Sequence, residues 1–465
     1  MPAQTDLAAL LERHLGARKV LSDARSLAHY GRDASTLGPF PPEAVVVPSS
    51  AEEVSAVLRL AYEYGFPVTP RGAGTGLTGG ALPVRGGVVL STERMQRIKE
   101  IDEEAFVAVV EPGVVTGTLQ QVLTERGLFY PPDPASLGTC SIGGNVAHNA
   151  GGPRALKYGV TREYVLGLDT VLPDGSRLRS GRRTTKGVVG YDLTGLLVGS
   201  EGTLGVTTEV TLRLIPEPKA RATLLTIFRT VVDAGRAVTR ILQSGFRPCA
   251  LELVDAPSID VLHQHGNHTF PPGAGALLLC ELDEEHEALG RVLDTCARAC
   301  EQVGALEQRH STEAREREAL WSARRAVYPT LVKTYPRMRV EDVCVPRTRI
   351  ADALSRLDEL SARYRIPTST LAHAGDGNLH IGLLRGVEQD REDTEERRME
   401  AMRADLMRTV LSLGGTLAGE HGIGHAKRSF LGWELSPEAI ALQRKMKALI
   451  DPKNLLNPQK IFTEA

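Results

Sequence analysis

A glycine-rich stretch from Pro70 to Gly80, with the sequence PRGAGTGLTGG, places the strongest constraint on the fold. Five of its eleven residues are glycine, which carries an entropic cost that suits sites where the backbone turns through positive φ or approaches a ligand closely. Successive backbone N–H groups in such a turn form a concave anion site, and Arg71, Thr75 and Thr78 would add donors. The stretch therefore predicts a loop that binds a phosphate.

The spacing Gly74-x-Gly76-x-x-Gly79 matches the fingerprint of dinucleotide-binding Rossmann folds, but the residues that follow do not. That fingerprint opens a helix, whereas residues 80–87 contain Pro83 and further glycines and form a helix poorly. The next apolar run, Val88 to Leu90, is typical of a strand. We therefore expect the loop to lie between two strands and to hold phosphate without a helix dipole.

Size and composition exclude several classes of partner. A chain of 465 residues exceeds what one core usually covers, which favours two domains. The formal net charge of −2 gives no reason to expect nucleic acid or an anionic membrane as a partner. We find no transmembrane segment and no signal-peptide core, so we expect a cytoplasmic protein. The six cysteines lack repeated Cys-x-x-Cys spacing, so any iron–sulfur centre would belong to another chain.

Residues 41–217 have the pattern of an α/β domain built around three glycine-rich patches. Ala44 to Val47 predicts a strand, and a capping box at Ser50 begins the helix that follows. A second patch runs from Thr139 to Gly152, and a third from Gly199 to Gly205. Patches spread this widely predict one extended ligand within a single domain.

The pattern of predicted strands and helices changes after Pro216-Glu-Pro218, where we expect a domain boundary. Strand-like runs there alternate with helices, which predicts an antiparallel sheet with helices on one face. The fold class is therefore α+β. We expect a helical segment at 1–40, the first domain at 41–217, the second domain at 218–455 and a separate tail at 456–465.

Two histidines in the second domain, His373 and His380, are candidate metal ligands. If Asp376-Gly377 forms a two-residue hairpin turn, the histidines are directly opposite, with Cβ atoms ~5 Å apart on one face of the sheet. That arrangement suits a shared metal ion. If the hairpin stood alone, two half-buried histidines satisfied by hydrogen bonds would be the simpler interpretation.

A second constellation supports the metal interpretation. Glu420 and His421 follow Gly414-Gly415 on a loop without bulky residues, and His425 lies close behind. Two histidines and one glutamate make a site for zinc or manganese with open positions, and a neighbouring histidine would be free to act as a base. Arg324 lies on a helix rich in arginine and glutamate. It could form a surface ion pair there or bind the carboxylate of a ligand, and both interpretations stay open.

The motifs stand along the chain in an order that resembles the FAD-linked oxidases of the vanillyl-alcohol oxidase type. The most similar branch contains the glycolate oxidase flavoprotein subunit and D-lactate dehydrogenase. The resemblance covers nearly the whole chain from Val45 onward. The motifs that carry it are the glycine loop, Pro131 to Pro134, Ser141 to Val146, Gly199 to Gly205, the histidine hairpin, Glu420 to Gly424 and Asp451 to Pro458.

The resemblance implies a two-part FAD-binding domain, a cap domain with an antiparallel sheet, and a C-terminal tail that returns to the FAD domain. It also implies noncovalent FAD, because the glycine loop contains no histidine or tyrosine. The residues that it assigns to FAD are Arg71, Gly72, Gly74, Thr75, Gly76, Gly79, Pro132, Asp133, Thr139, Gly143, Gly144, Asn145, Gly199, Glu201, Gly202, Val206 and Asn457.

The resemblance further implies oxidation of a small D-2-hydroxy acid, glycolate or D-lactate, to the 2-oxo acid. The metal would bind the substrate, the base would take the hydroxyl proton, and hydride would pass to FAD. The residues that it assigns to this chemistry are His373, His380 and Glu420 for the metal, His421 as the base, Arg324 for the substrate carboxylate and Asn378 beside the substrate.

Three alternatives stay open. Relatives that act on D-2-hydroxyglutarate carry a lysine shortly before the strand around Asp342, where this chain has Arg339-Val340-Glu341, which favours a substrate with one carboxylate. The alkylglycerone-phosphate synthase type uses a similar fold for a transferase reaction, and a catalytically silent subunit would only dock on an iron–sulfur partner. An iron–sulfur subunit, a quinone or a cytochrome could accept the electrons, and peripheral membrane attachment through a partner and oligomer formation are also open.

Overall fold

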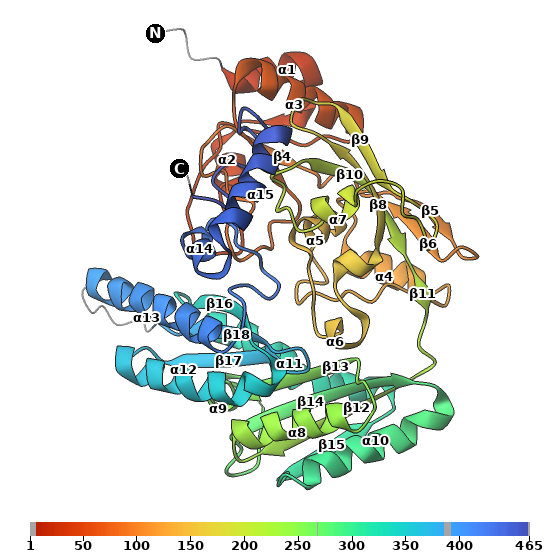
Figure 1. The fold of residues 1–465 in the computed structure, drawn as a ribbon, viewed down its shortest axis with the longest axis vertical. Coiled ribbons are helices and arrows are strands. Elements are labelled where there is room, and N and C mark those ends of the chain that lie inside the picture. Colours follow the sequence, from red (N-terminus) through yellow and green to blue (C-terminus); the bar gives the residue numbers. More distant parts are fainter. Residues whose placement is uncertain (1–5, 267, 386–391, 464–465) are drawn as a thin grey trace. The chain divides into compact units, whose positions relative to one another are not determined.

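The computed structural model of this chain describes residues 6–266, 268–385 and 392–463, which divide into two compact units (Figure 1). The first unit comprises Met1–Gly152, Gly159–Glu217 and Glu420–Ala465. The second comprises Pro153–Tyr158 and Pro218–Gly419.

One sheet of the first unit carries the glycine-rich loop. Its strand order is β1-β2-β4-β3, and β4 is parallel to both β2 and β3. The loop connects β3 to β4, and none of residues 72–87, all of which are described, is helical, so the prediction of a loop between strands is confirmed. The strands are β1 (Val20–Leu21), β2 (Ala44–Val46), β3 (Val68–Arg71) and β4 (Val88–Ser91).

Apolar side chains of α1 and α3 form the core beside this sheet. Helix α3 begins after Ser50, whose hydroxyl accepts the Glu53 backbone N–H, and ends at Gly65, where φ is 76°. Val57 and Leu58 lie on its buried face, and full burial of such a side chain contributes roughly 1.5–3 kcal/mol. The helices are α1 (Leu7–Leu15), α2 (Ala24–Tyr30) and α3 (Ala51–Tyr64).

The second sheet of the first unit is antiparallel, with the order β5-β6-β10-β8-β9. Short helices connect its strands, and a two-stranded ribbon of β7 and β11 lies outside it. The elements are β5 (Ile98–Asp102), β6 (Val107–Val110), α4 (Thr116–Thr124), β7 (Leu128–Phe129), α5 (Ile142–His148), β8 (Val165–Val171), β9 (Arg177–Gly181), α7 (Leu193–Leu197), β10 (Val206–Arg213) and β11 (Ile215–Pro216).

The chain returns to the first unit at Glu420, earlier than the tail at 456–465 that we expected. The return begins early because Thr78 of the glycine-rich loop already donates its hydroxyl hydrogen to the carbonyl of His421, at 2.9 Å. The described part of the expected segment 1–40, from Asp6 onward, also belongs to this unit, since α1 contributes to its core. The C-terminal segment contains α14 (Leu431–Glu434) and α15 (Pro437–Ile450).

The second unit is built on a seven-stranded sheet with the order β15-β12-β14-β13-β17-β18-β16. Every neighbouring pair is antiparallel, as predicted. The strands are β12 (Ala220–Phe228), β13 (Ala250–Asp255), β14 (Ala276–Glu284), β15 (Glu307–Ser311), β16 (Arg339–Cys344), β17 (Thr368–His373) and β18 (Asn378–Leu383).

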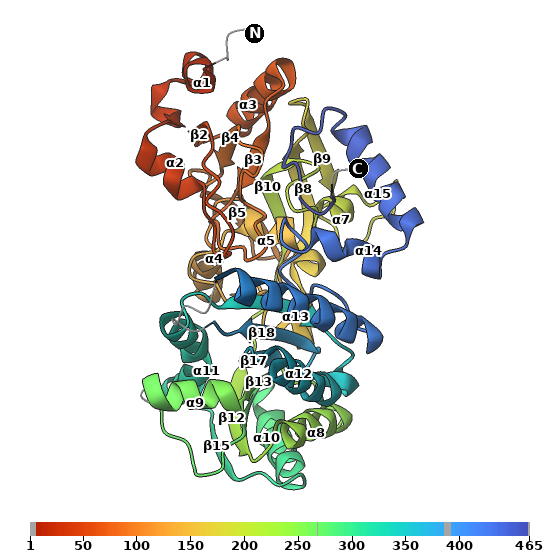
Figure 2. The same cartoon turned by 90° about the vertical axis from the view of Figure 1, so that its left-hand side faces the viewer.

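Helices cover both faces of this sheet (Figure 2). The expected layer consists of α8, α10, α12 and α13, and α9 and α11 add a second layer on the opposite face, where their apolar residues pack with Leu225, Leu279 and Leu371. The helices are α6 (Ala155–Tyr158), α8 (Val231–Gln243), α9 (Ala256–His265), α10 (His286–Glu301), α11 (Ala314–Thr334), α12 (Ile350–Tyr364) and α13 (Glu392–Ser412).

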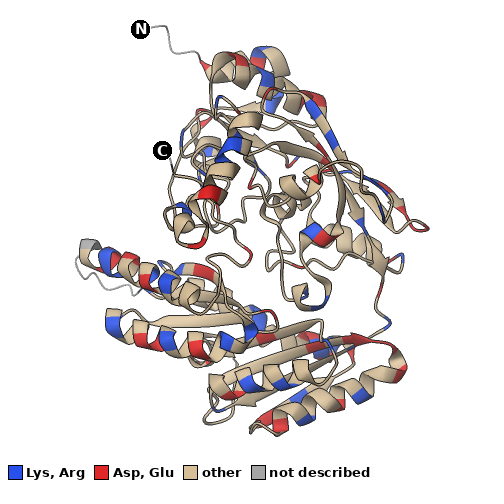
Figure 3. Cartoon of the chain, viewed as in Figure 1, with Lys and Arg blue, Asp and Glu red and all other residues tan. Residues whose placement is uncertain are grey.

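The helix surfaces carry charges of both signs. Lys and Arg alternate with Asp and Glu along the helices of the second unit (Figure 3), in agreement with a formal net charge of −2. Within the described residues, no helix combines the length and apolar character needed to cross a membrane.

Candidate active site

The histidine hairpin joins β17 to β18 through a turn of four residues, Ala374 to Gly377. His373 pairs with Asn378 and His380 with Leu371, so the predicted direct pairing of the two histidines was wrong by two residues. Because side chains alternate with a period of two, this shift leaves both histidines on one face as diagonal neighbours. Their ring centroids lie 4.9 Å apart, so the predicted proximity is confirmed.

The turn is wider than predicted because the backbone N–H groups of Asp376 and Gly377 both donate to the His373 carbonyl, at 3.3 and 3.1 Å. Gly377 has a φ of 93°, and a Cβ there would lie 2.0 Å from the carbonyl oxygen of Val345. A side chain at this position would therefore push the turn away from the chain that follows β16.

A buried carboxylate orients His373. Glu252 pairs with His373 across β13 and β17, is 0% exposed, and lies with Oε1 2.6 Å from His373 Nδ1. Since a carboxylate accepts, Nδ1 donates and Nε2 is left as the ligand atom. Burial alone would raise the pKa of Glu252, but the charges of His373 and Arg324 outweigh it and lower the pKa to about 2.

The same carboxylate holds Arg324. Glu252 Oε2 accepts from Arg324 Nε at 2.9 Å and forms an ion pair with Nη2 at 2.7 Å. The arginine side chain is only 13% exposed. Arg324 therefore does form an ion pair, but the pair is buried, and the interpretation that placed it on the surface was wrong. Arg324 lies on α11 with Arg317 and Trp321, at helical spacing, and those two side chains donate to Glu281 on the same sheet face. A guanidinium has five donors, and Glu252 uses two of them.

A second buried acid lies beside His380. Asp342 pairs with His380 across β16 and β18, is 1% exposed, and has Oδ1 3.6 Å from His380 Nε2. Asp342 Oδ1 also accepts from Asn378 Nδ2 at 2.6 Å, and Oδ2 accepts the Gly419 backbone N–H at 3.0 Å. Asn378 is buried, and its amide nitrogen thus belongs to this internal network.

Glu420 and His421 begin the C-terminal segment of the first unit, and Glu420 directly follows Gly419, the last residue of the second unit. The carboxylate of Glu201, at the third glycine patch, accepts the backbone N–H groups of Ile423 and Gly424 at 2.8 and 2.7 Å. This carboxylate therefore fixes the loop that carries His421.

Asn457 joins the same parts from the C-terminal side. Its Nδ2 donates to the carbonyls of Gly80 and Glu201 at 3.0 and 2.7 Å, and its backbone N–H donates to Val68 at 2.7 Å. The glycine-rich loop, the third patch and the C-terminal segment therefore meet at one asparagine.

The glycine-rich loop fits an anionic group. Gly74 and Gly79 have φ values of 71° and 77°, and a Cβ on Gly72 would lie 2.4 Å from the Ser141 hydroxyl oxygen. Within the described part of the chain, none of the backbone N–H groups of residues 73–78 donates a hydrogen bond to protein. Such a run of donors in a turn of this shape suits a pyrophosphate.

Arg71 has internal partners. Its Nη1 donates to the Arg32 carbonyl at 2.7 Å, and the expected contact of its other donors with a phosphate stays a prediction. The guanidinium also lies over the Tyr30 ring, 5.4 Å from its centroid. In this structure Arg71 therefore braces the loop.

The other residues assigned to FAD differ in how much side chain they present. Asn145 donates Nδ2 to Thr116 at 2.7 Å, Val206 is buried in the core cluster, and Thr139 is exposed. The others lie in or beside the glycine-rich patches, namely Gly76, Pro132, Asp133, Gly143, Gly144, Gly199 and Gly202.

Three polar residues of these regions were missed by the sequence analysis: Glu252 and Asp342 as partners of the histidines, and Lys460. The available signal for Glu252 was an acid between two apolar residues of a strand, Leu251 and Leu253. Lys460 is buried, donates to the Leu82 carbonyl at 2.7 Å, and has a pKa that burial lowers to about 7.

The family comparison agrees with this arrangement. Residues 217–461 match the profile of the FAD linked oxidases, C-terminal domain, and residues 42–181 match an FAD binding domain. The chain belongs to the FAD-linked oxidases. The resemblance inferred from the motifs is thereby confirmed, and FAD is the cofactor that this oxidase family implies.

Relatives of this FAD-linked oxidase match it along nearly its whole length. The glycolate oxidase subunit GlcD of Bacillus subtilis (strain 168) is 39% identical over 94% of this chain and 92% of its own. The D-lactate dehydrogenase of Archaeoglobus fulgidus is 40% identical over 90% of each chain. The structure of p-cresol methylhydroxylase with substrate bound aligns with a TM-score of 0.79 over 98% of this oxidase and 96% of that chain, at 18% identity, and shares the fold.

Proposed function

We propose that this oxidase converts a small D-2-hydroxy acid, glycolate or D-lactate, to the 2-oxo acid, with FAD as hydride acceptor and a divalent metal at the histidine hairpin. The observation that carries the proposal is the pair of imidazoles 4.9 Å apart, each beside a buried carboxylate. Relatives named glycolate oxidase subunit and D-lactate dehydrogenase support the substrate class.

The donor set suits a zinc or manganese ion. His373 Nε2 and His380 would be two ligands, and Glu252 would fix the ring of His373 as carboxylates commonly do beside metal-binding histidines. Glu420 would be the third, because it follows Gly419, whose N–H is bonded to the acid beside His380. When bound, the metal would supply a Lewis acid for the substrate hydroxyl, and FAD would supply the hydride acceptor.

The protein side chains would hold the substrate and move the proton. His421 would take the hydroxyl proton, on a loop fixed by Thr78 and Glu201. Arg324 would hold the substrate carboxylate with the donors that Glu252 does not use. Asn378 would line the site, held in place by its hydrogen bond to Asp342.

The position that distinguishes hydroxyglutarate relatives supports a substrate with one carboxylate. Arg339 lies there, and its guanidinium forms ion pairs with Glu341 at 3.6 Å and with Glu400 of α13. A guanidinium engaged by two carboxylates is poorly placed to bind a second substrate carboxylate.

For FAD we propose that the backbone N–H groups of residues 73–78 hold the pyrophosphate and that the second and third glycine patches line the rest of the noncovalent cofactor. The electrons would then pass to an iron–sulfur subunit, a quinone or a cytochrome. A cytoplasmic location, with any membrane attachment made through such a partner, belongs to the same proposal.

An anaerobic visible spectrum before and after addition of glycolate or D-lactate tests the proposal. Loss of the flavin absorption at about 450 nm with one of them is expected. The same experiment after chelation, with and without Zn²⁺ or Mn²⁺ added back, tests the metal. An oxidised flavin spectrum that ignores both acids would refute the substrate class and favour the transferase or the silent subunit. Full reduction after complete metal removal would refute the metal.

A further inference from the structure

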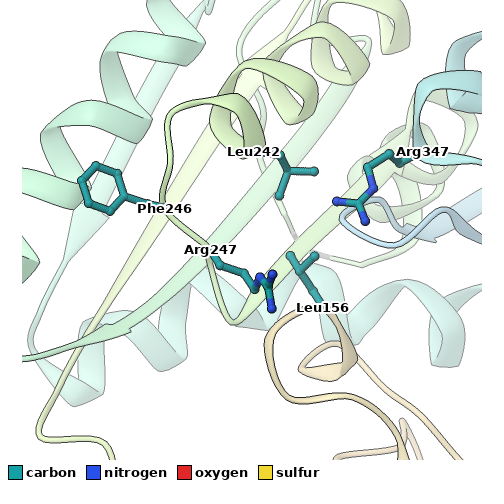
Figure 4. Close-up of a pocket in the computed structure, with 5 residues that line it drawn as sticks. All are labelled: Leu156, Leu242, Phe246, Arg247 and Arg347. Carbon is teal, nitrogen blue, oxygen red and sulfur yellow. The ribbon is translucent and has the colours of Figure 1, made fainter.

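A small pocket lies in the second unit (Figure 4). Its volume is about 270 Å³, and it is lined by Leu156, Leu242, Phe246, Arg247 and Arg347. These residues come from three separate segments: α6, the end of α8 with the loop that follows, and the chain after β16.

The two arginines give the pocket an uncompensated positive charge. Arg247 and Arg347 are exposed, and neither forms an ion pair with any residue that the structure describes. Arg349, two residues further along the chain, pairs with Asp352 at 2.8 Å. Figure 4 shows both pocket guanidinium groups beside Leu156. An anion placed between them would form charge-assisted hydrogen bonds and relieve their mutual repulsion.

Apolar side chains form the smaller part of the lining. Leu156 and Leu242 contribute hydrocarbon surface, whereas the ring of Phe246 points away from the two guanidinium groups (Figure 4). The volume lies just below the roughly 300–1,000 Å³ of typical ligand pockets, which excludes a nucleotide-sized occupant. A ligand with an anionic head and a small apolar body matches this lining.

The pocket touches the turn of the histidine hairpin. A Cβ on Gly375 would lie 2.3 Å from Leu156 Cδ2, so Leu156 rests directly on the turn. A Cβ on Gly377 would lie 3.4 Å from the backbone nitrogen of Arg347. Two of the pocket residues are therefore packed against residues 374–377, between the strands that carry His373 and His380.

We infer that this pocket binds a small organic carboxylate with an apolar body, and that the bound anion restrains the turn at residues 374–377. The site is separate from the histidines, and the inference does not depend on the proposed reaction. Its occupant would hold the segments of Leu156 and Arg347 against the two glycines of the turn.

The test uses the full-length, FAD-loaded protein without substrate. Calorimetric titration with 4-methylpentanoate measures binding, with 4-methylpentanamide as the uncharged analogue and inorganic phosphate as the anion without an apolar body. Arg247→Gln and Arg347→Gln should each weaken 4-methylpentanoate binding by roughly tenfold or more. Arg349→Gln is the matched control and should leave the Kd unchanged, and Leu242→Trp should fill the pocket and abolish binding.

Hydrogen exchange locates the ligand. We expect 4-methylpentanoate to slow amide exchange at residues 374–377 in the wild type and in Arg349→Gln, and not in the two pocket variants. Binding that persists in both pocket variants would place the ligand elsewhere and overturn the site. Equal affinity for the amide or for phosphate would overturn the ligand class, and unchanged exchange at 374–377 during binding would overturn the effect on the turn.

Discussion

The replacement Glu252→Gln tests how the structure prepares His373 for metal binding. Glutamine has nearly the same size as glutamate, but it removes the charge that both His373 Nδ1 and Arg324 contact, at 2.6 Å and 2.7–2.9 Å. Removing one partner of a buried ion pair typically costs about 3–5 kcal/mol. Loss of a carboxylate that orients a metal-binding histidine lowers metal affinity by roughly 10–100-fold. We expect both effects in the variant.

The pKa of Glu252 gives a second estimate of the stability that this carboxylate contributes. Its value falls from 4.5 to about 2 in the folded, metal-free protein, mainly because the charges of His373 and Arg324 outweigh burial. A shift of this size corresponds to ~3 kcal/mol of stability. Since the folded-state pKa is lowered, this stability is present above pH 4.5 and is lost as the pH falls from 4.5 to 2. Glu252→Gln should lack that part of the acid dependence.

Glu281→Gln is the matched control. Glu281 lies on the same sheet face and accepts from Arg317 and Trp321 at 2.9 and 2.8 Å, without a histidine. Urea unfolding should show both variants destabilised, whereas Mn²⁺ or Zn²⁺ titration should show weaker binding only in Glu252→Gln. If Glu252→Gln binds the metal as tightly as the wild type, Glu252 does not prepare the ligand and our reasoning about this site fails.

Three further predictions concern the first unit. His421→Ala should retain FAD yet lose anaerobic flavin reduction by the substrate, while His425→Gln should keep it; the reverse result would move the base to His425. Gly72→Ala should weaken FAD binding to the apoprotein, because its Cβ would lie 2.4 Å from a hydroxyl oxygen, whereas Gly138→Ala, whose Cβ meets nothing within 4 Å, should not. Because the folded-state pKa of Lys460 is lowered from 10.5 to about 7, the free energy of unfolding should rise between pH 7 and 10.5, and Lys460→Met should flatten that rise.

Sequence patterns predicted what depends on backbone geometry. Glycines at 74 and 79 adopt positive φ, and the strand that follows the loop excluded a Rossmann helix. The face shared by His373 and His380 was also predictable, because it survives a register shift of two residues. The register itself was not, since it depends on the hydrogen bonds that Asp376 and Gly377 donate to the His373 carbonyl and on the close approach of Gly377 to Val345, which is distant in sequence.

Side-chain contacts between residues far apart in the sequence could not be predicted from sequence patterns. Glu252 meets His373 only because β13 and β17 are neighbours in the sheet, and strand order is not encoded in any local motif. Arg324 showed the same limit: its sequence context allowed an ion pair or a clamp, and only the sheet reveals which acid it meets. The second helical layer was likewise hidden, because a strand buried on both faces has no alternation to read.

Two of the buried acids on the sheet face that carries His373, namely Glu252 and Glu281, distinguish stability from function. Replacing a buried ion pair with apolar residues of similar volume is often neutral or stabilising, so stability alone explains neither Glu252–Arg324 nor Glu281–Arg317. The pairs resemble each other in their arginine from α11, but only Glu252 also holds a histidine that lies within 4.9 Å of a second histidine. Glu252 has no exposed surface and fixes one tautomer of His373, so its role is explained by metal binding at that imidazole. A change in metal affinity should therefore reveal the role of Glu252.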